Sequence, residues 1–447
     1  MSYRRVVGAL GLLLFSAASL AEPLTVGQVM ADLQYFRDTW TPREKSFTPE
    51  TRQQSIDFIN NQIASAHPMG RADLALVFAQ AAAFSGNNHT LIYLYDVPGL
   101  FHSLPFSFWW FSEGAVVTRT HPEYRQLLGA RIVSVGGVPI REAASRVERF
   151  IAGIASHKRY LSPLWLTRIE SLQAIGVARD GRADFQFALP TGKKIRESLG
   201  IAPTVDPDAL SPVWLESVVP DRGAGSWPQI LDDIKELPMY LQPPTELSWR
   251  LLRDGSVLYV RSTSLSSHKV DVSAYHMVDE LINSGQLPRA VVVDLRYNEG
   301  GDFFNVLNLA NEILKMTEPR GGIYVITGRA TNSAAIIFTA LLKGGAPSRT
   351  KVVGEEISDR PWFWSEGATL TAPNSGIPLN YTGGYHDWAH GCVDLSKCYW
   401  PVVYFGVKAG SLDPDIPVDM SIREYIRGKD PALEAVLADL DAASGSR

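Results

Sequence analysis

The sequence has little cysteine, no excess of basic charge and no long apolar run beyond its first 21 residues. Only two of its 447 residues are cysteine, which excludes a disulfide-rich scaffold and leaves any zinc site short of thiolates. The formal net charge of −5 argues against a nucleic-acid partner, which would require a basic surface. Internal repeats and low-complexity tracts are also lacking, which excludes solenoid architectures.

The composition that remains is that of an ordinary globular protein. Hydrophobic residues make up 45% of the chain and charged residues 20%. A chain of 447 residues is too long for one core, so we expect two or three domains.

Residues 1–21 have the pattern of a secretory signal peptide. Arg4 and Arg5 form a positive start, an apolar run extends from Val6 to Phe15, and the small residues "SLA" precede Glu22. The run is short for a membrane span, although an uncleaved anchor is the alternative. We therefore expect an exported protein, periplasmic or secreted, without stable membrane insertion after cleavage.

The two cysteines, Cys392 and Cys398, stand close together near the C-terminus. In an oxidising compartment this spacing predicts a small disulfide loop. A zinc site that adds His386 and His390 of "HDWAHGC" is the weaker alternative, and we predict no metal and no cofactor.

The chain divides by pattern into four parts after the leader. Residues 22–98 carry apolar residues at three- and four-residue steps and predict helices. Residues 99–244 are mixed α+β and end in a linker rich in Pro, Asp and Gly. Residues 245–435 alternate strands and helices, which predicts an α/β domain around a parallel sheet, and residues 436–447 are left as a tail.

Unusual residues follow two of the predicted strands. In "VVVDLRYNEGGD", Gly300 and Gly301 come after a buried run, and in "TGRATNSAAIIF", Ser333 begins a helix. Ligands of α/β proteins bind at this edge of the sheet. Ser333 is either an N-cap or a nucleophile, and the glycine pair is either a structural turn or a source of backbone N–H donors.

A nucleophilic serine needs a base, and His89 in "SGNNHTLIYL" is the best candidate. Lys343 lies about three turns along the same predicted helix as Ser333 and is too distant. The alternative is that His89 is a hydrogen-bonded loop histidine.

Together, "VVVDLRYNEGG", "GIYVITGRATNSAA" and "VVGEE" resemble the tail-specific (C-terminal processing) serine protease family, which includes the tricorn protease core. The resemblance implies a crotonase/ClpP-like βαβ core with an N-terminal helical domain. "LLGARIVSVGGVPI" is similar to the family's PDZ-like segment, in divergent form. "NNHT" resembles the turn of the histidine-using branch.

The family pattern implies catalytic roles for several residues. Ser333 would be the nucleophile and His89 the general base, and the N–H groups of Ala334 and of Gly300 or Gly301 would form the oxyanion hole. Arg360 stands near the place of the lysine used by the processing branch, and arginine cannot accept a proton. The group that orients His89 stays open. The candidates are Asn88, Glu355, Glu356 and Asp387.

We therefore expect an exported serine peptidase that cleaves peptides or unfolded proteins. Two alternatives remain open. One is a non-catalytic binder of apolar ligands or peptides, with a pocket lined by the aromatic runs at 103–111 and 360–367. The other is an ester hydrolase that uses the same Ser–His pair. Packing within the core is the simpler interpretation of both aromatic runs.

Overall fold

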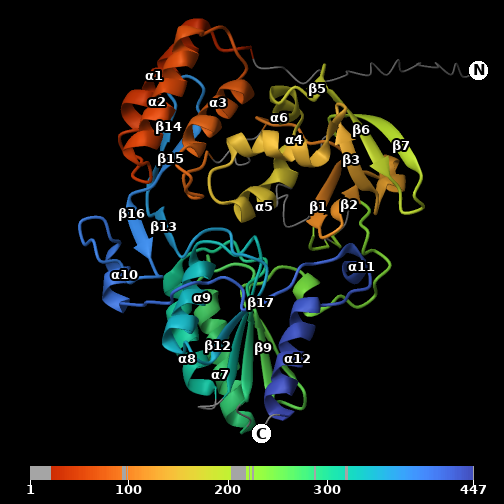
Figure 1. The fold of residues 1–447 in the computed structure, drawn as a ribbon, viewed down its shortest axis with the longest axis vertical. Coiled ribbons are helices and arrows are strands. Elements are labelled where there is room, and N and C mark those ends of the chain that lie inside the picture. Colours follow the sequence, from red (N-terminus) through yellow and green to blue (C-terminus); the bar gives the residue numbers. More distant parts are fainter. Residues whose placement is uncertain are drawn as a thin grey trace, which may run out of the picture.

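The computed structural model describes residues 22–92, 97, 99–202, 218–220, 222–223, 226–285, 288–317 and 321–445. The signal peptide predicted over residues 1–21 lies outside these ranges. One half of the molecule contains the N-terminal helices and an antiparallel sheet, and the other half is built around a parallel sheet (Figure 1).

The second half of the chain forms a six-stranded sheet in the order β17-β12-β11-β10-β9-β8. All its neighbouring strands pair in parallel except β8, which is antiparallel to β9 at one edge. This arrangement confirms the α/β class. The strands are Ser248–Leu252 (β8), Val257–Arg261 (β9), Ala290–Asp294 (β10), Gly322–Thr327 (β11), Thr350–Gly354 (β12) and Ile416–Pro417 (β17).

Helices cover both faces of this sheet, which explains why its strands are continuous apolar runs (Figure 1). Alternate residues of β10 face opposite layers: Val291 and Val293 pack with helices α7 to α9, and Val292 packs with α12. The helices are Lys269–Ser284 (α7), Leu307–Met316 (α8), Ala334–Gly345 (α9) and Pro431–Gly445 (α12).

Helix α12 runs from Pro431 to Gly445 and so continues past residue 435, where the sequence pattern predicts the start of a tail. Ala432 and Val436 are buried in the same apolar cluster as Tyr324 and Val353 of the sheet. Residues 436–445 therefore continue the helix, which packs against the sheet as far as Leu440.

The first half of the chain has one apolar core shared by the N-terminal helices and a seven-stranded antiparallel sheet. In the helical part, Phe36 stacks on Trp40 and Phe78, with ring centroids 4.3 and 5.0 Å away. The helices are Val26–Tyr35 (α1), Pro49–Ala64 (α2), Arg71–Ala83 (α3), Ile140–Val147 (α4), Ala155–Leu166 (α5) and Ile169–Ala174 (α6). The strands are Phe106–Phe111 (β1), Gly114–Thr120 (β2), Arg131–Val135 (β3), Val138–Pro139 (β4), Ala178–Arg179 (β5), Arg182–Ala188 (β6) and Lys194–Gly200 (β7).

A hairpin from the second half returns to the N-terminal helices (Figure 1). The buried carboxylate of Asp32 on α1 accepts the backbone N–H groups of Asn374 and Ser375 at 2.9 and 2.8 Å. The two halves are thus joined by more than one crossing of the chain. The elements of this region are Trp362–Ser365 (β13), Ala368–Thr371 (β14), Pro378–Tyr381 (β15), Gly384–Asp387 (β16) and Trp400–Phe405 (α10). The short helix Ile422–Tyr425 (α11) lies elsewhere, where Tyr425 packs with Phe111 of β1.

Cys392 and Cys398 are joined by a disulfide, with their Cα atoms 5.9 Å apart, which confirms the predicted pairing. Neither sulfur is therefore a thiolate ligand, so the zinc alternative loses both of its cysteines. Within the described ranges, no helix has both the length and the apolar character needed to cross a membrane.

Candidate active site

Ser333 lies at the start of α9 in a strained backbone conformation, with φ 50° and ψ −121°. Residues other than glycine rarely adopt positive φ, and such strain is typical of functional sites. Ser333 occupies the N-cap position, yet its side chain makes no capping hydrogen bond. The hydroxyl is therefore not used to cap the helix.

Gly300, the first of the glycine pair, packs directly against Ser333. Gly300 and Gly301 have φ values of 101° and 138°. A Cβ on Gly300 would lie 2.6 Å from the Ser333 Cβ and 2.9 Å from the Ala334 nitrogen. No side chain fits at that distance, so the approach of the two turns requires glycine.

Two backbone N–H groups in the glycine turn and at the start of α9 have no acceptor among the described residues. One belongs to Ala334, the first residue of α9, and the other to Gly301. The N–H of Gly300, by contrast, donates to Asn298 Oδ1 at 2.9 Å. Of the two glycines predicted as oxyanion donors, Gly301 is thus the one whose N–H has no acceptor among the described residues.

Asn298 holds the two turns together. Its amide oxygen accepts the Gly300 N–H, and its backbone oxygen accepts the Asn332 N–H at 3.0 Å. Its amide nitrogen donates to the oxygens of Ser262 at 3.0 and 3.1 Å. Asn298 is fully buried, so these bonds are shielded from water.

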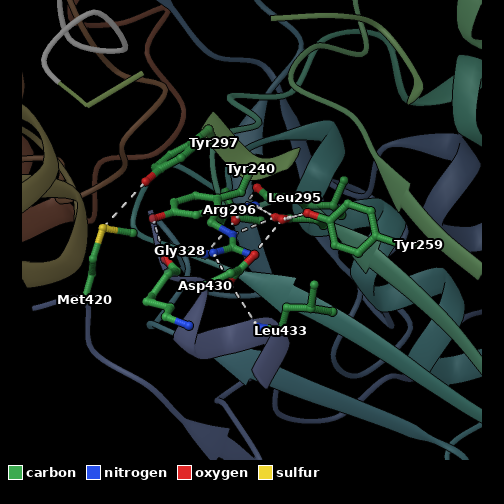
Figure 2. Close-up of polar contacts among 12 residues, drawn as sticks. Tyr240, Tyr259, Leu295, Arg296, Tyr297, Gly328, Met420, Asp430 and Leu433 are labelled. Atoms are coloured by element: carbon green, nitrogen blue, oxygen red, sulfur yellow. Dashed lines mark hydrogen bonds and ion pairs between the residues drawn. The ribbon is translucent and has the colours of Figure 1, made fainter. Parts of the chain in front are cut away.

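A buried ion network anchors the strand end that leads into the glycine turn. Figure 2 shows the Arg296 guanidinium beside Asp430, with bonds of 2.8 and 3.0 Å to both carboxylate oxygens. Arg296 Nε donates to Asp294 at 2.9 Å, and Tyr259 donates its hydroxyl to the same carboxylate. The network ties the end of β10 to the start of α12. Asp294 and Arg296 therefore have a structural role: they hold the strand end that leads into the glycine turn.

The turn that carries His89 lies against the turn that carries Ser333. Asn88 Nδ2 donates to Asn332 Oδ1 at 2.8 Å, across 244 positions of sequence. Each of these asparagines directly precedes a predicted catalytic residue. The structure therefore brings the two predicted turns together.

The imidazole of His89 does not hydrogen-bond Ser333. Both its ring nitrogens are buried and have no hydrogen-bond partner. The ring stacks on Phe363 with centroids 4.9 Å apart, and Phe363 stacks in turn on His386 at the same distance. Burial, and then His386, lower the pKa of His89 to about 4, whereas Glu366 raises it. His89 is therefore a neutral imidazole at neutral pH.

Neither predicted glutamate bonds the imidazole of His89. Glu355 accepts two bonds from Arg329, at 2.8 and 3.0 Å. Burial raises the pKa of Glu355, but Arg329 outweighs it and the net pKa is lowered. The backbone oxygen of Glu356 accepts a bond from Ser156. Asp387 bonds His390 instead.

Several titratable groups near His89 carry no sequence signal that singles them out. Glu366 lies 3.4 Å from Nε2 of His386 and is the carboxylate that acts on His89 electrostatically. His157 of α5 bonds Ser358 Oγ at 2.6 Å. Asp359 accepts the backbone N–H of Asn88. Only the antiparallel pairing of β13 and β16, which a sequence pattern does not reveal, brings the Glu366 and His386 segments together.

The aromatic run at 103–111 packs mainly within the core, whereas in the run at 360–367 Phe363 is buried but Trp362 is 38% exposed. All but one residue of β1 are buried, and Phe363 is 3% exposed. Trp109 lies beneath the Arg329 guanidinium, 4.9 Å from the ring centroid. A cavity of about 30 Å³ beside Trp109 is too small for an extended apolar ligand.

No protein-family model and no curated protein matches the sequence. Among solved structures, a mutant of CPAF matches with a TM-score of 0.56 and 13% identity over 90% of this chain and 95% of that chain. Mature CPAF matches with a TM-score of 0.55 and 13% identity over 90% and 94%. A photosystem II D1 C-terminal processing protease gives a TM-score of 0.38 and 13% identity over 91% and 98%.

Identity of 13% to CPAF carries information on the fold alone. The match extends over nine-tenths of the chain, so it includes parts of both halves of the molecule. This agrees with the resemblance found in the motifs around Gly300 and Ser333. The chain has the fold of the tail-specific protease family.

Proposed function

We propose that this chain is a serine peptidase in which Ser333 attacks the carbonyl carbon of a peptide bond. One observation carries the proposal: Ser333 is strained and uncapped at the start of α9, against a glycine turn that no side chain could enter. A serine that served only as an N-cap would accept a backbone N–H of the helix with its hydroxyl oxygen.

The N–H groups of Ala334 and Gly301 would receive the oxyanion that forms on attack. Both are fixed backbone donors, and the Ala334 N–H also lies at the positive end of the α9 dipole. Removal of one such donor typically costs about 3 kcal/mol of transition-state stabilisation.

His89 is the proposed base that takes the proton of Ser333. Its low pKa keeps the imidazole neutral and able to accept a proton. The transfer requires the ring to turn from Phe363 toward Ser333, a movement that breaks no hydrogen bond of the ring within the described residues. Glu366 supplies the negative charge that favours the imidazolium once it forms.

The remaining expectations are also proposals. A signal peptide at residues 1–21 would export the chain, and the Cys392–Cys398 disulfide suits an oxidising compartment. We further propose that the region 99–244 contains a divergent PDZ-like segment and a linker, and that the parallel sheet is a crotonase/ClpP-like core.

A non-catalytic binder is the second candidate, and one observation favours it: the imidazole of His89 makes no bond to Ser333. A binder would keep its ligand affinity in Ser333→Ala and would have no hydrolase activity to lose. An ester hydrolase would share the catalytic pair and differ only in substrate.

Covalent labelling with a fluorophosphonate probe tests the proposal. We expect wild type to label, Ser333→Ala not to label, and His89→Ala to label about 10² to 10⁴ times more slowly. Ser65→Ala, an exposed serine at the end of α2, is the control and should label like wild type. Equal labelling of all four proteins, or no labelling of wild type, would refute the proposal. A panel of peptides and esters then separates peptidase from esterase.

A further inference from the structure

The turn at residues 87–90 is held from two directions by side-chain amides. Asn87 pairs with the backbone of Trp364 through two bonds: its Nδ2 donates to the Trp364 oxygen at 3.0 Å, and its Oδ1 accepts the Trp364 N–H at 2.9 Å. Asn88 bonds Asn332 of the turn that carries Ser333. The position of His89 is therefore set by contacts of its neighbours.

Asp359 provides a third tie to this turn. Its carboxyl group is 1% exposed, and each of its oxygens accepts one backbone N–H: Oδ2 from Asn88 at 3.4 Å and Oδ1 from Arg360 at 2.8 Å. A carboxylate can accept at both oxygens, whereas a protonated carboxyl must donate from one of them. The ionised group fits both contacts, because it accepts a hydrogen bond at each oxygen.

We propose that Asp359 is a positioning residue whose carboxylate fixes the 87–90 turn beside the nucleophile and so sets where His89 stands relative to Ser333. The inference rests on the proposed function for its catalytic consequence. Asn88 directly precedes His89, and its partner Asn332 directly precedes Ser333, so release of Asn88 moves the base relative to the nucleophile. A displacement of about 1 Å at such a site typically costs about a hundredfold in rate.

The charges around Asp359 indicate when the tie is strong. Burial raises the pKa of Asp359 to about 7, against the lowering effect of the Arg360 N–H and charge and of the Asn88 N–H. The Arg360 guanidinium lies 3.9 Å away. His89, which follows Asn88, and His157, which bonds Ser358, are neutral at pH 7 because burial lowers their pKa to about 4 and about 3.

The sign of the pH effect follows from these groups. As the pH falls through about 7, Asp359 gains a proton, and one of its oxygens then presents an O–H to a backbone N–H donor. The tie to Asn88 weakens on the acid side. The activity should therefore fall below about pH 7 because of Asp359, and not because of His89.

The first experiment compares Asp359→Asn with wild type in rate of hydrolysis between about pH 5 and 9. We expect the wild-type kcat to fall about tenfold per pH unit below about 7, and the Asp359→Asn profile to lack this limb, with KM little changed. Asp32→Asn is the matched control, since Asp32 is also buried and also accepts two backbone N–H groups, but in the α1 region. It should keep the limb. A limb that persists in Asp359→Asn would overturn the proposal.

The second experiment measures hydrogen exchange of the Asn88 amide and does not depend on catalysis. Asp359→Ala removes its acceptor, so we expect this amide to exchange at least tenfold faster than in wild type, with the Asn374 amide unchanged. An unchanged rate at Asn88 would overturn the proposal even if the enzyme is active. Faster exchange in a protein that no probe labels would support the tie while refuting the peptidase.

Discussion

The close approach of Gly300 to Ser333 makes Gly300→Ala the sharpest test of the site. The new Cβ would stand 2.6 Å from the Ser333 Cβ and 2.8 Å from the Asn332 oxygen. Carbon atoms rest at about 3.5 to 4.0 Å, so the two turns must separate by about 1 Å. The substitution also forces a residue with a side chain to keep φ near 101°.

Both effects have expected magnitudes. Overpacking of this kind costs about 1 to 3 kcal/mol, and the unfavourable φ adds about 1 to 3 kcal/mol. We therefore expect Gly300→Ala to lower the free energy of unfolding by about 2 to 6 kcal/mol. The separation of the turns should slow labelling of Ser333 about a hundredfold.

Gly137→Ala is the matched control. Gly137 has φ 78°, yet a Cβ there would meet nothing within 4 Å. It therefore shares the backbone strain without the clash, and should cost about 1 to 3 kcal/mol while labelling remains at the wild-type rate. The measurements are urea unfolding and the rate of fluorophosphonate labelling. If Gly300→Ala matches Gly137→Ala in both, the proposed contact between the turns is wrong.

Three further changes test other parts of the structure. Arg296→Met leaves two buried carboxylates without their cation and should cost about 3 to 5 kcal/mol in urea unfolding; a loss below about 1 kcal/mol would contradict the network. Cys392→Ser opens a loop of sequence separation 6 and should cost about 2 kcal/mol in thermal or urea unfolding, whereas the same change in reduced protein should cost almost nothing. His89 and His157 have folded-state pKa values below the ordinary value, so the stability they contribute is complete above about pH 6.5 and is lost as the pH falls toward 4 and 3. Each adds about 1.4 kcal/mol per pH unit to the slope, and His157→Gln should remove its share; an unchanged slope would contradict its burial in the neutral form.

Much of the fold could be predicted from local pattern. The buried run at residues 291–294 predicts a central strand because a strand covered on both faces needs apolar residues at every position. The glycine pair and Ser333 stand where strands end, which is the edge at which α/β proteins bind ligands. The close spacing of Cys392 and Cys398 and the expected oxidising compartment predict their disulfide, which the structure contains.

The candidate site could be predicted only in part. The sequence indicated the turns of Ser333 and His89. It did not indicate that the Gly300 N–H donates to the side chain of Asn298. It also placed Glu355 among the possible partners of His89, although Glu355 is paired with Arg329. These outcomes depend on which of several nearby groups lies at bonding distance, and a linear pattern does not encode distance.

By itself, the sequence determined the strand and helix periods, the glycine turn and the helix start at Ser333, because each depends on residues within a few positions of one another. Tertiary structure alone decided that Asp430 pairs with Arg296 across 134 positions, and that Asp359 reaches Asn88 across 271. Such pairs form because burial of apolar faces brings distant segments together, and buried polar groups must then bond whatever partner the packing leaves within reach.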